Sequence, residues 1–159
     1  MGAIFNVFPL ILIPVLIYNI WAFASGIGAD HPQEVRGHLT EPMFTLPMAS
    51  REVDIAAAAE GATRAVTWSV SFGDVLVLLS LVLLFIELLK STSTGTAAIF
   101  NHALSMLVFI ICLVEFLLHP AFATSPFFLI MIMALLDVLA GVVVTIVSAR
   151  RDVEFAGGH

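Results

Sequence analysis

Charged residues are scarce in this sequence. They make up 11% of it, whereas about a quarter of the residues in soluble domains are charged. The six Lys and Arg residues form no basic patch, so nucleic acid is not an expected partner. Hydrophobic residues reach 60%, and the mean hydropathy is +1.09. This composition predicts a membrane protein, and its 159 residues suit a single membrane domain over residues 1–159.

Residues that carry enzymatic or cofactor chemistry are also few. Cys112 is the only cysteine and lies in an apolar run, which excludes an intramolecular disulfide. There is no phosphate-binding loop, no dinucleotide fingerprint and no motif for a serine or cysteine nucleophile. His102 and His119 lie about 25 Å apart on the same predicted helix, so they do not form a bis-histidine haem site. We therefore expect a non-enzymatic protein without a cofactor.

Long hydrophobic segments dominate the sequence instead. A bilayer core about 30 Å thick is crossed by about 20 apolar residues in an α-helix. Four segments meet this requirement, at about 4–24, 73–90, 98–118 and 126–148. A β-barrel would show short alternating strands, which unbroken apolar runs such as Met106–Val114 exclude. The sequence therefore predicts an all-α membrane protein built as a bundle of four transmembrane helices.

The first hydrophobic segment has one feature of a signal peptide, because Ala22-Phe23-Ala24 resembles a cleavage site. However, no Lys or Arg precedes the segment, and it is long for the apolar core of a signal peptide. We expect it to be retained as a helix. Pro9 and Pro14 predict a bend, and Tyr18 and Trp21 are expected to mark its outer interface.

Orientation follows from the basic residues near the spans. Lys90, Arg150 and Arg151 fall on one side of the membrane if four helices alternate. Because cytoplasmic flanks are enriched in Lys and Arg, that side is predicted to be cytoplasmic, with both termini inside. The outer loop 25–72 carries three arginines, and six acidic residues outnumber them.

The outer loop is predicted to contain a small extracytoplasmic β-hairpin. Residues 43–50 and 65–72 alternate between apolar and polar side chains, which is typical of strands. Phe44, Leu46 and Trp68 belong to the apolar face. This face is expected to lie on the outer ends of the helices, with Trp68 near the lipid headgroups.

A short helix is predicted before the hairpin, ending at Gly37. His31, Glu34 and His38 recur on one face at helical spacing, and such side chains are ligands of divalent metal ions. Against a metal site, Gly37 is expected to end the helix before His38, and no fourth ligand is specified. These three residues remain weak candidates for a metal or ligand site on the outer face.

Polar and small residues recur along three of the predicted spans at helical spacing. The stripes are Gly73, Ser80 and Glu87 in the second span, Asn101, Ser105, Cys112, Glu115 and His119 in the third, and Ala134, Asp137, Gly141, Thr145 and Ser148 in the fourth. Small and hydroxylated residues form the contacts between membrane helices. The three stripes are therefore predicted to face one another.

Six ionisable residues within these spans are functional candidates, because charged groups are costly in hydrocarbon. They are Asp74, Glu87, His102, Glu115, His119 and Asp137. Glu87 and His102 are expected at similar depth near the cytoplasmic end, in a structural cluster with Lys90. Asp74 directly follows Gly73 and is expected to cap the start of the second helix.

The remaining candidates lie in the third and fourth spans. Glu115 and His119 are one turn apart near the outer end, where they are expected to pair or to reach toward the headgroups. Asp137 is expected near the midplane and is the hardest to explain. It is interpreted either as a protonated or hydrogen-bonded packing residue, or as a group that relays protons, binds a ligand or docks another subunit.

Several stretches resemble a known family. They are Gly73–Leu79, His102–Phe109, Ala134–Gly141 and the tail Ser148–Asp152. Over about residues 68–152 the chain is similar to small uncharacterised four-helix inner-membrane proteins of alphaproteobacteria. This resemblance implies a multi-pass protein of the bacterial cytoplasmic (inner) membrane and transfers no catalytic role. The segment 51–64 is longer than the usual loop of that family.

Two functions from different classes are consistent with these patterns. The first is an accessory or structural subunit that packs against a larger membrane complex or against itself. It is expected to keep Asp137 dry and to present an apolar or small-residue flank, including Gly141, to another chain. The second is a proton-coupled transporter or channel component that uses Asp137 with the Glu and His groups of the second and third helices. No inverted repeat supports it. Expected partners are membrane lipid and other membrane subunits.

Overall fold

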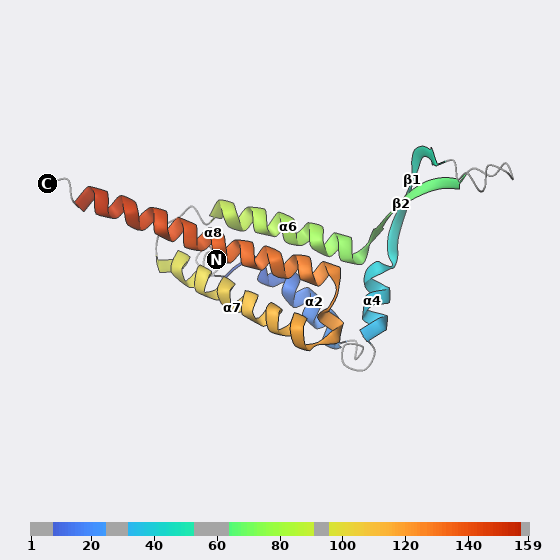
Figure 1. Ribbon diagram of the computed structural model, residues 1–159, viewed down its shortest axis with the longest axis horizontal. Coiled ribbons are helices and arrows are strands. Elements are labelled where there is room, and N and C mark those ends of the chain that lie inside the picture. Colours follow the sequence, from blue (N-terminus) through green and yellow to red (C-terminus); the bar gives the residue numbers. More distant parts are fainter. Residues whose placement is uncertain (1–7, 25–31, 53–63, 91–95, 157–159) are drawn as a thin grey trace.

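The computed structural model describes residues 8–24, 32–52, 64–90 and 96–156. This part of the chain is predominantly helical and contains one two-stranded sheet. Its elements are α2 (Leu12–Ala24), α4 (Pro32–Thr40), β1 (Pro42–Glu52), β2 (Arg64–Ser71), α6 (Phe72–Lys90), α7 (Thr96–Leu118), the 3₁₀ turn η1 (Pro120–Phe122) and α8 (Ser125–Ala156). The helices α6, α7 and α8 run alongside one another, α2 packs against them, and the hairpin extends from the end at which α6 begins (Figure 1).

Three of the described helices are long and apolar enough to cross a membrane. Their spanning segments are Phe72–Lys90, Ile99–Leu118 and Ser125–Val147, which match the last three predicted spans. They indicate a membrane protein. The helix α2 has 13 residues and is a shorter apolar helix, and residues 4–7 of the first predicted span lie outside the described part. The count of four spans therefore stays a prediction.

One face of α2 and of the turn before it is buried in the bundle. Ile11, Val15, Tyr18 and Ala22 recur at steps of four, three and four residues, and all are buried. Tyr18, which was expected to mark the outer interface, is packed inside the bundle with its side chain 0% exposed. Its hydroxyl donates to the Ala121 carbonyl oxygen at 3.0 Å. The position of this hydroxyl is set by the turn between α7 and α8, which local sequence does not reveal.

The short helix α4 does not end at Gly37, as the sequence predicted, but continues to Thr40. A glycine inside a helix costs only about 1 kcal/mol relative to alanine, so packing can override it. Leu39 in the last turn is buried at 1% exposure, and the Thr40 hydroxyl donates to the Gly37 carbonyl oxygen at 3.0 Å. Burial of Leu39 therefore explains the extra turn.

The predicted hairpin is present. The strands β1 and β2 are antiparallel, and Phe44 is paired with Val70 while Leu46 is paired with Trp68. Because side chains alternate along a strand, these pairs share one face of the ribbon. The next pair in the ladder, Thr45 with Ser69, belongs to the opposite face. The two faces thus differ in polarity as the sequence pattern predicted.

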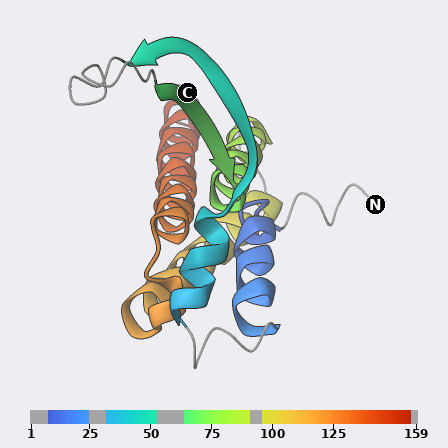
Figure 2. The same cartoon turned by 90° about the vertical axis from the view of Figure 1, so that its right-hand side faces the viewer.

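The apolar face of the hairpin does not lie on the outer ends of the helices, contrary to expectation. Phe44, Leu46 and Trp68 are 49%, 48% and 56% exposed. The ribbon instead projects obliquely away from the bundle (Figures 1 and 2). Since β2 ends at Ser71 and α6 begins at Phe72, no linker lets the ribbon fold back over the helix ends.

Gly73 provides a test of the packing where α4, α6 and α8 meet. A Cβ atom at this position would lie 2.7 Å from Cγ of Pro126 and 3.1 Å from the Leu39 carbonyl oxygen. We expect Gly73→Ala to destabilise the protein by about 1–3 kcal/mol, because the added methyl overpacks this contact. The measurement is the unfolding transition in detergent, monitored by circular dichroism.

Gly37→Ala is the matched control, because a Cβ atom there has nothing within 4 Å. As a helix-interior position, it should gain up to about 1 kcal/mol from the substitution. Equal stability of the two variants would contradict the close packing at Gly73.

Candidate functional site

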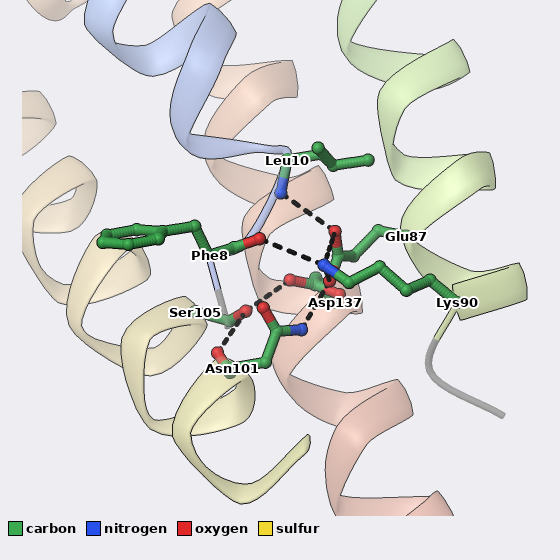
Figure 3. A network of polar contacts seen from close by, with 7 residues as sticks. All are labelled: Phe8, Leu10, Glu87, Lys90, Asn101, Ser105 and Asp137. Atoms are coloured by element: carbon green, nitrogen blue, oxygen red, sulfur yellow. Dashed lines mark hydrogen bonds and ion pairs between the residues drawn. The ribbon is translucent and has the colours of Figure 1, made fainter. Parts of the chain in front are cut away.

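Polar side chains from the three predicted stripes meet inside the bundle. They form a group that we call the polar cluster, consisting of Glu87, Lys90, Asn101, Ser105 and Asp137 (Figure 3). These residues come from α6, α7 and α8, so the stripes face one another here as predicted. The cluster lies toward the end of the bundle at which α6 finishes, away from the hairpin (Figure 1).

Glu87 is the most heavily bonded member of the cluster. Its side chain is 0% exposed, and its carboxylate accepts hydrogen bonds from three separate segments. The donors are the Lys90 ammonium group at 3.1 Å, the Asn101 side-chain amide and the backbone amide of Leu10 at 2.9 Å. A buried carboxylate is tolerated only when it is paired and hydrogen-bonded. Glu87 satisfies that condition.

The N-terminal segment is held in place by this carboxylate and by Lys90. Amides in the first turn of a helix have no partner within the helix. Leu10 lies in the turn that leads into α2, and Pro9 before it has no N–H to offer. Glu87 accepts from this free Leu10 amide, while the Lys90 ammonium group donates to the Phe8 carbonyl oxygen at 3.1 Å. Both ends of the short segment are thus fixed to α6.

Asp137 lies about half-way along the spanning segment of α8 and faces inward, with 1% of its surface exposed. The Ser105 hydroxyl donates to its Oδ2 atom at 2.5 Å. The same hydroxyl lies 3.1 Å from the Asn101 carbonyl oxygen, which links Asp137 to the helix turn that carries Glu87's amide partner. Asp137 is therefore buried and hydrogen-bonded within the chain.

His102 lies at the depth of Glu87, as predicted, but does not join the hydrogen-bonded cluster that was expected to include it. The partner of Glu87 on α7 is Asn101, whereas the His102 ring lies against Gly141 of α8. Gly141 accordingly faces α7, as its place in the stripe of the fourth span predicted, and not another chain, as the accessory-subunit hypothesis expected. In the described part of the chain, both ring nitrogens of His102 and the Oδ1 atom of Asp137 are buried without a hydrogen-bond partner.

Asp74 caps the start of α6, as the sequence predicted. Its carboxylate accepts hydrogen bonds from the Ser71 backbone amide at 2.9 Å and from the Ser71 hydroxyl at 2.7 Å. The Asp74 backbone amide in turn donates to the Ser71 hydroxyl oxygen at 3.3 Å. This reciprocal arrangement is a capping box, in which side chains satisfy amides that the helix leaves free. Asp74 is exposed and makes no contact with the polar cluster.

Glu115 and His119 belong to a separate group at the end of the bundle from which the hairpin extends, which we call the outer end, the opposite end being the inner end. The Glu115 carboxylate accepts a hydrogen bond from the Asn19 side-chain amide of α2 at 3.2 Å. The His119 ring packs edge-on against Phe23 and Phe122, with centroids 5.4 Å apart in both pairs. Asn19 was not among the sequence-predicted site residues, because its contact with Glu115 joins segments 96 residues apart.

An apolar layer separates the inner and outer polar groups. Ser105 and Glu115 are ten residues apart on α7, which corresponds to about 15 Å along a helix. Val108 and Cys112 fill the interval and are buried, and the Ser80 hydroxyl donates to its own helix at the Leu76 carbonyl oxygen. Among the described residues, no chain of hydrogen bonds connects Asp137 to the outer end.

The metal candidates do not assemble in the part of the chain that the structure describes. That part contains no group of three or more His, Cys, Asp or Glu side chains arranged to hold a metal ion. His31 lies outside the described residues, and His38 is 3.5 Å from the Glu41 carboxylate instead. A cavity of about 320 Å³ lies near α4, lined by Arg36, Leu39, Thr40 and residues 123–126, and it does not include the polar cluster.

No protein-family model, curated protein or solved structure matches this chain. The resemblance to small alphaproteobacterial inner-membrane proteins therefore stays a prediction. What the site can do follows from its geometry alone, in which buried polar groups of three helices bond to one another.

Glu87→Ala tests the central role of this carboxylate. The substitution leaves three donors without their acceptor, including the buried Asn101 amide. We expect a loss of about 3–5 kcal/mol, as found when one partner of a buried ion pair is removed. The measurement is unfolding by increasing amounts of denaturing detergent in mixed micelles.

Asp74→Ala is the matched control, since Asp74 is an exposed acid on the same helix that bonds only Ser71 in the structure described above. Loss of its cap should cost about 1 kcal/mol. If the two alanine variants were equally stable, Glu87 would not hold the bundle together.

The contact between Gly141 and His102 provides a second test. A Cβ atom at position 141 would overlap the His102 ring. We expect Gly141→Ala to destabilise the protein by about 1–3 kcal/mol. Adding His102→Ala should restore much of this loss, because it removes the ring that the new methyl group meets. An absence of rescue in the double variant would show that Gly141 acts through another contact.

Proposed function

We propose that this chain is a four-span membrane protein with a non-catalytic role. It serves as an accessory or structural subunit that packs against a larger membrane complex or against another copy of itself. The observation that carries the proposal is the polar cluster, in which the buried Glu87 carboxylate is bonded by Lys90, Asn101 and the Leu10 backbone amide. An intramembrane acid in a transporter would instead be expected to face a water-filled path.

The position of Asp137 supports this function. It is 1% exposed, bonded to Ser105 and separated from the outer polar group by the apolar layer. A proton relay needs groups within hydrogen-bonding reach along the whole path. The described residues offer such groups in the inner half of the bundle and again at Glu115, with the apolar layer between them.

The outward surfaces of the helices also support it. Large apolar side chains such as Ile20, Phe85, Ile99 and Leu117 are more than half exposed. In a bilayer these side chains contact acyl chains or the helices of a partner, and both contacts are apolar. The buried charged groups Glu87 and Asp137 are turned inward. Association with another membrane protein would therefore occur through the exposed apolar side chains of the helices.

The proposed location is the bacterial cytoplasmic membrane with both termini in the cytoplasm. The helix α6 ends at Lys90, and α8 carries Arg150 near its end; both helix ends point away from the hairpin (Figure 1). Basic residues collected at one end favour that end as cytoplasmic. The sequence resemblance supports a bacterial inner membrane.

The accessory role predicts stable association. Purification of the tagged chain in a mild detergent, followed by native mass spectrometry, is expected to show a stoichiometric partner chain or a defined homo-oligomer. Outward variants such as Phe85→Ala and Ile99→Ala are expected to weaken that association more than the stability of the chain. A chain that is monomeric and without a partner under these conditions would contradict the proposal.

A proton-coupled transporter is the second candidate. The observation that favours it is the group of buried atoms with spare hydrogen-bonding capacity at His102 and Asp137. Reconstitution into vesicles that enclose a pH-sensitive dye separates the two functions. We expect the protein to dissipate a pH gradient no faster than empty vesicles do. Dissipation that is abolished by Asp137→Asn would overturn the accessory role and establish transport.

A further inference from the structure

The hairpin carries large apolar side chains on one face of its ribbon. Phe44, Leu46 and Trp68 are 49%, 48% and 56% exposed. On the opposite face of the ribbon, Thr45 is paired with Ser69. An isolated two-stranded hairpin is marginally stable in water, so a ribbon with one apolar face requires something to cover it.

The position of the hairpin relative to the membrane is set by α6. This helix has 19 residues and is therefore about 28 Å long, close to the thickness of the hydrocarbon core. Phe72 at its start thus lies at the outer edge of the hydrocarbon. Because β2 ends at Ser71, the hairpin begins at the same level. Gly73 packs closely against Pro126 and against the Leu39 carbonyl oxygen, which fixes this junction.

The apolar residues of the hairpin lie close to that edge. Val70 and Trp68 precede Phe72 by two and four residues, so Trp68 is at most about 13 Å away along a strand. The ribbon leaves the bundle obliquely, which shortens its distance from the membrane plane (Figure 1). The headgroup region of one leaflet is about 5–8 Å thick. An inclined ribbon therefore brings Trp68 and its neighbours within reach of this region.

We propose that the apolar face of the hairpin is a lipid-binding surface that inserts into the headgroup region of the outer leaflet. The face is continuous along the chain with Val75 and Leu78, exposed apolar residues of the first turns of α6. Tryptophan is enriched at this depth because its ring is apolar while its N–H remains able to bond. At the other end of the ribbon, Glu52 is paired with Arg64, so charged residues are farthest from the bilayer. The occupant of the face is phospholipid.

This inference needs α6 to span the membrane with the hairpin on the outer side, as proposed above, and it does not depend on the accessory role. Its test uses the fluorescence of Trp68 in the Trp21→Phe variant, since the sequence contains only two tryptophans. The protein is reconstituted into phosphatidylcholine and phosphatidylglycerol vesicles that carry a quencher either on the headgroup or deep in the acyl chain. We expect headgroup quenchers to remove most of the Trp68 emission and deep quenchers to remove little of it.

A second variant distinguishes lipid contact from mere proximity to the membrane. In the Trp21→Phe/Trp68→Phe background, Ser69→Trp places the only tryptophan on the opposite face of the same strand. We expect this tryptophan to be quenched by iodide in the aqueous phase and less by the lipid labels. Circular dichroism and unfolding in detergent verify that both variants are folded.

Two results would overturn the proposal. Trp68 emission at long wavelength that is quenched by iodide alone would place the face in water. Trp68 emission at short wavelength that neither iodide nor the lipid-attached quenchers reduce would show that another protein or a second copy covers the apolar face. Partner co-purification is measured separately, so its outcome does not affect this test.

Discussion

The inner half of the bundle depends on one buried carboxylate. Glu87 accepts hydrogen bonds from its own helix, from α7 and from the segment that precedes α2. In hydrocarbon, a charged group without partners raises the free energy of the folded protein. A buried donor that loses its acceptor raises it in the same way. Breaking any of these hydrogen bonds is therefore costly. The bonds fix the depth and the rotation of each segment that supplies a donor to Glu87.

The same constraint explains how the surface is arranged. Polar side chains in the spans turn toward one another, as Asp137 does toward Ser105, and apolar side chains face outward. Stabilisation by burial from water is weak between membrane helices, because lipid is as apolar as leucine. Close packing at small residues, such as Gly141 beneath the His102 ring, and buried hydrogen bonds then supply the specificity of the bundle. The polar groups of the cluster are bonded within the chain. The proposed association with another membrane protein therefore depends on the exposed apolar side chains.

The features predicted correctly from the sequence depend on local or periodic patterns. The last three spans follow from apolar length, the hairpin from alternation, and the Asp74 cap from its position next to Ser71 and Gly73. The features that were missed depend on contacts between distant segments. The bond from Leu10 to Glu87 joins residues 77 apart, and Tyr18 reaches a carbonyl 103 residues away. No local spacing reports such a contact.

The errors at Gly37 and at the hairpin face have the same origin. A glycine predicts the end of a helix only when the residues after it are not stabilised by remaining helical. Here the helical turn after Gly37 is stabilised, because it buries Leu39. Similarly, an apolar strand face predicts that something packs against it, but the sequence pattern does not identify that packing partner. The direct junction of β2 with α6 removes the helix ends as that cover and leaves the ribbon at the edge of the hydrocarbon. In the proposed lipid contact, the bilayer is the packing partner of this apolar face.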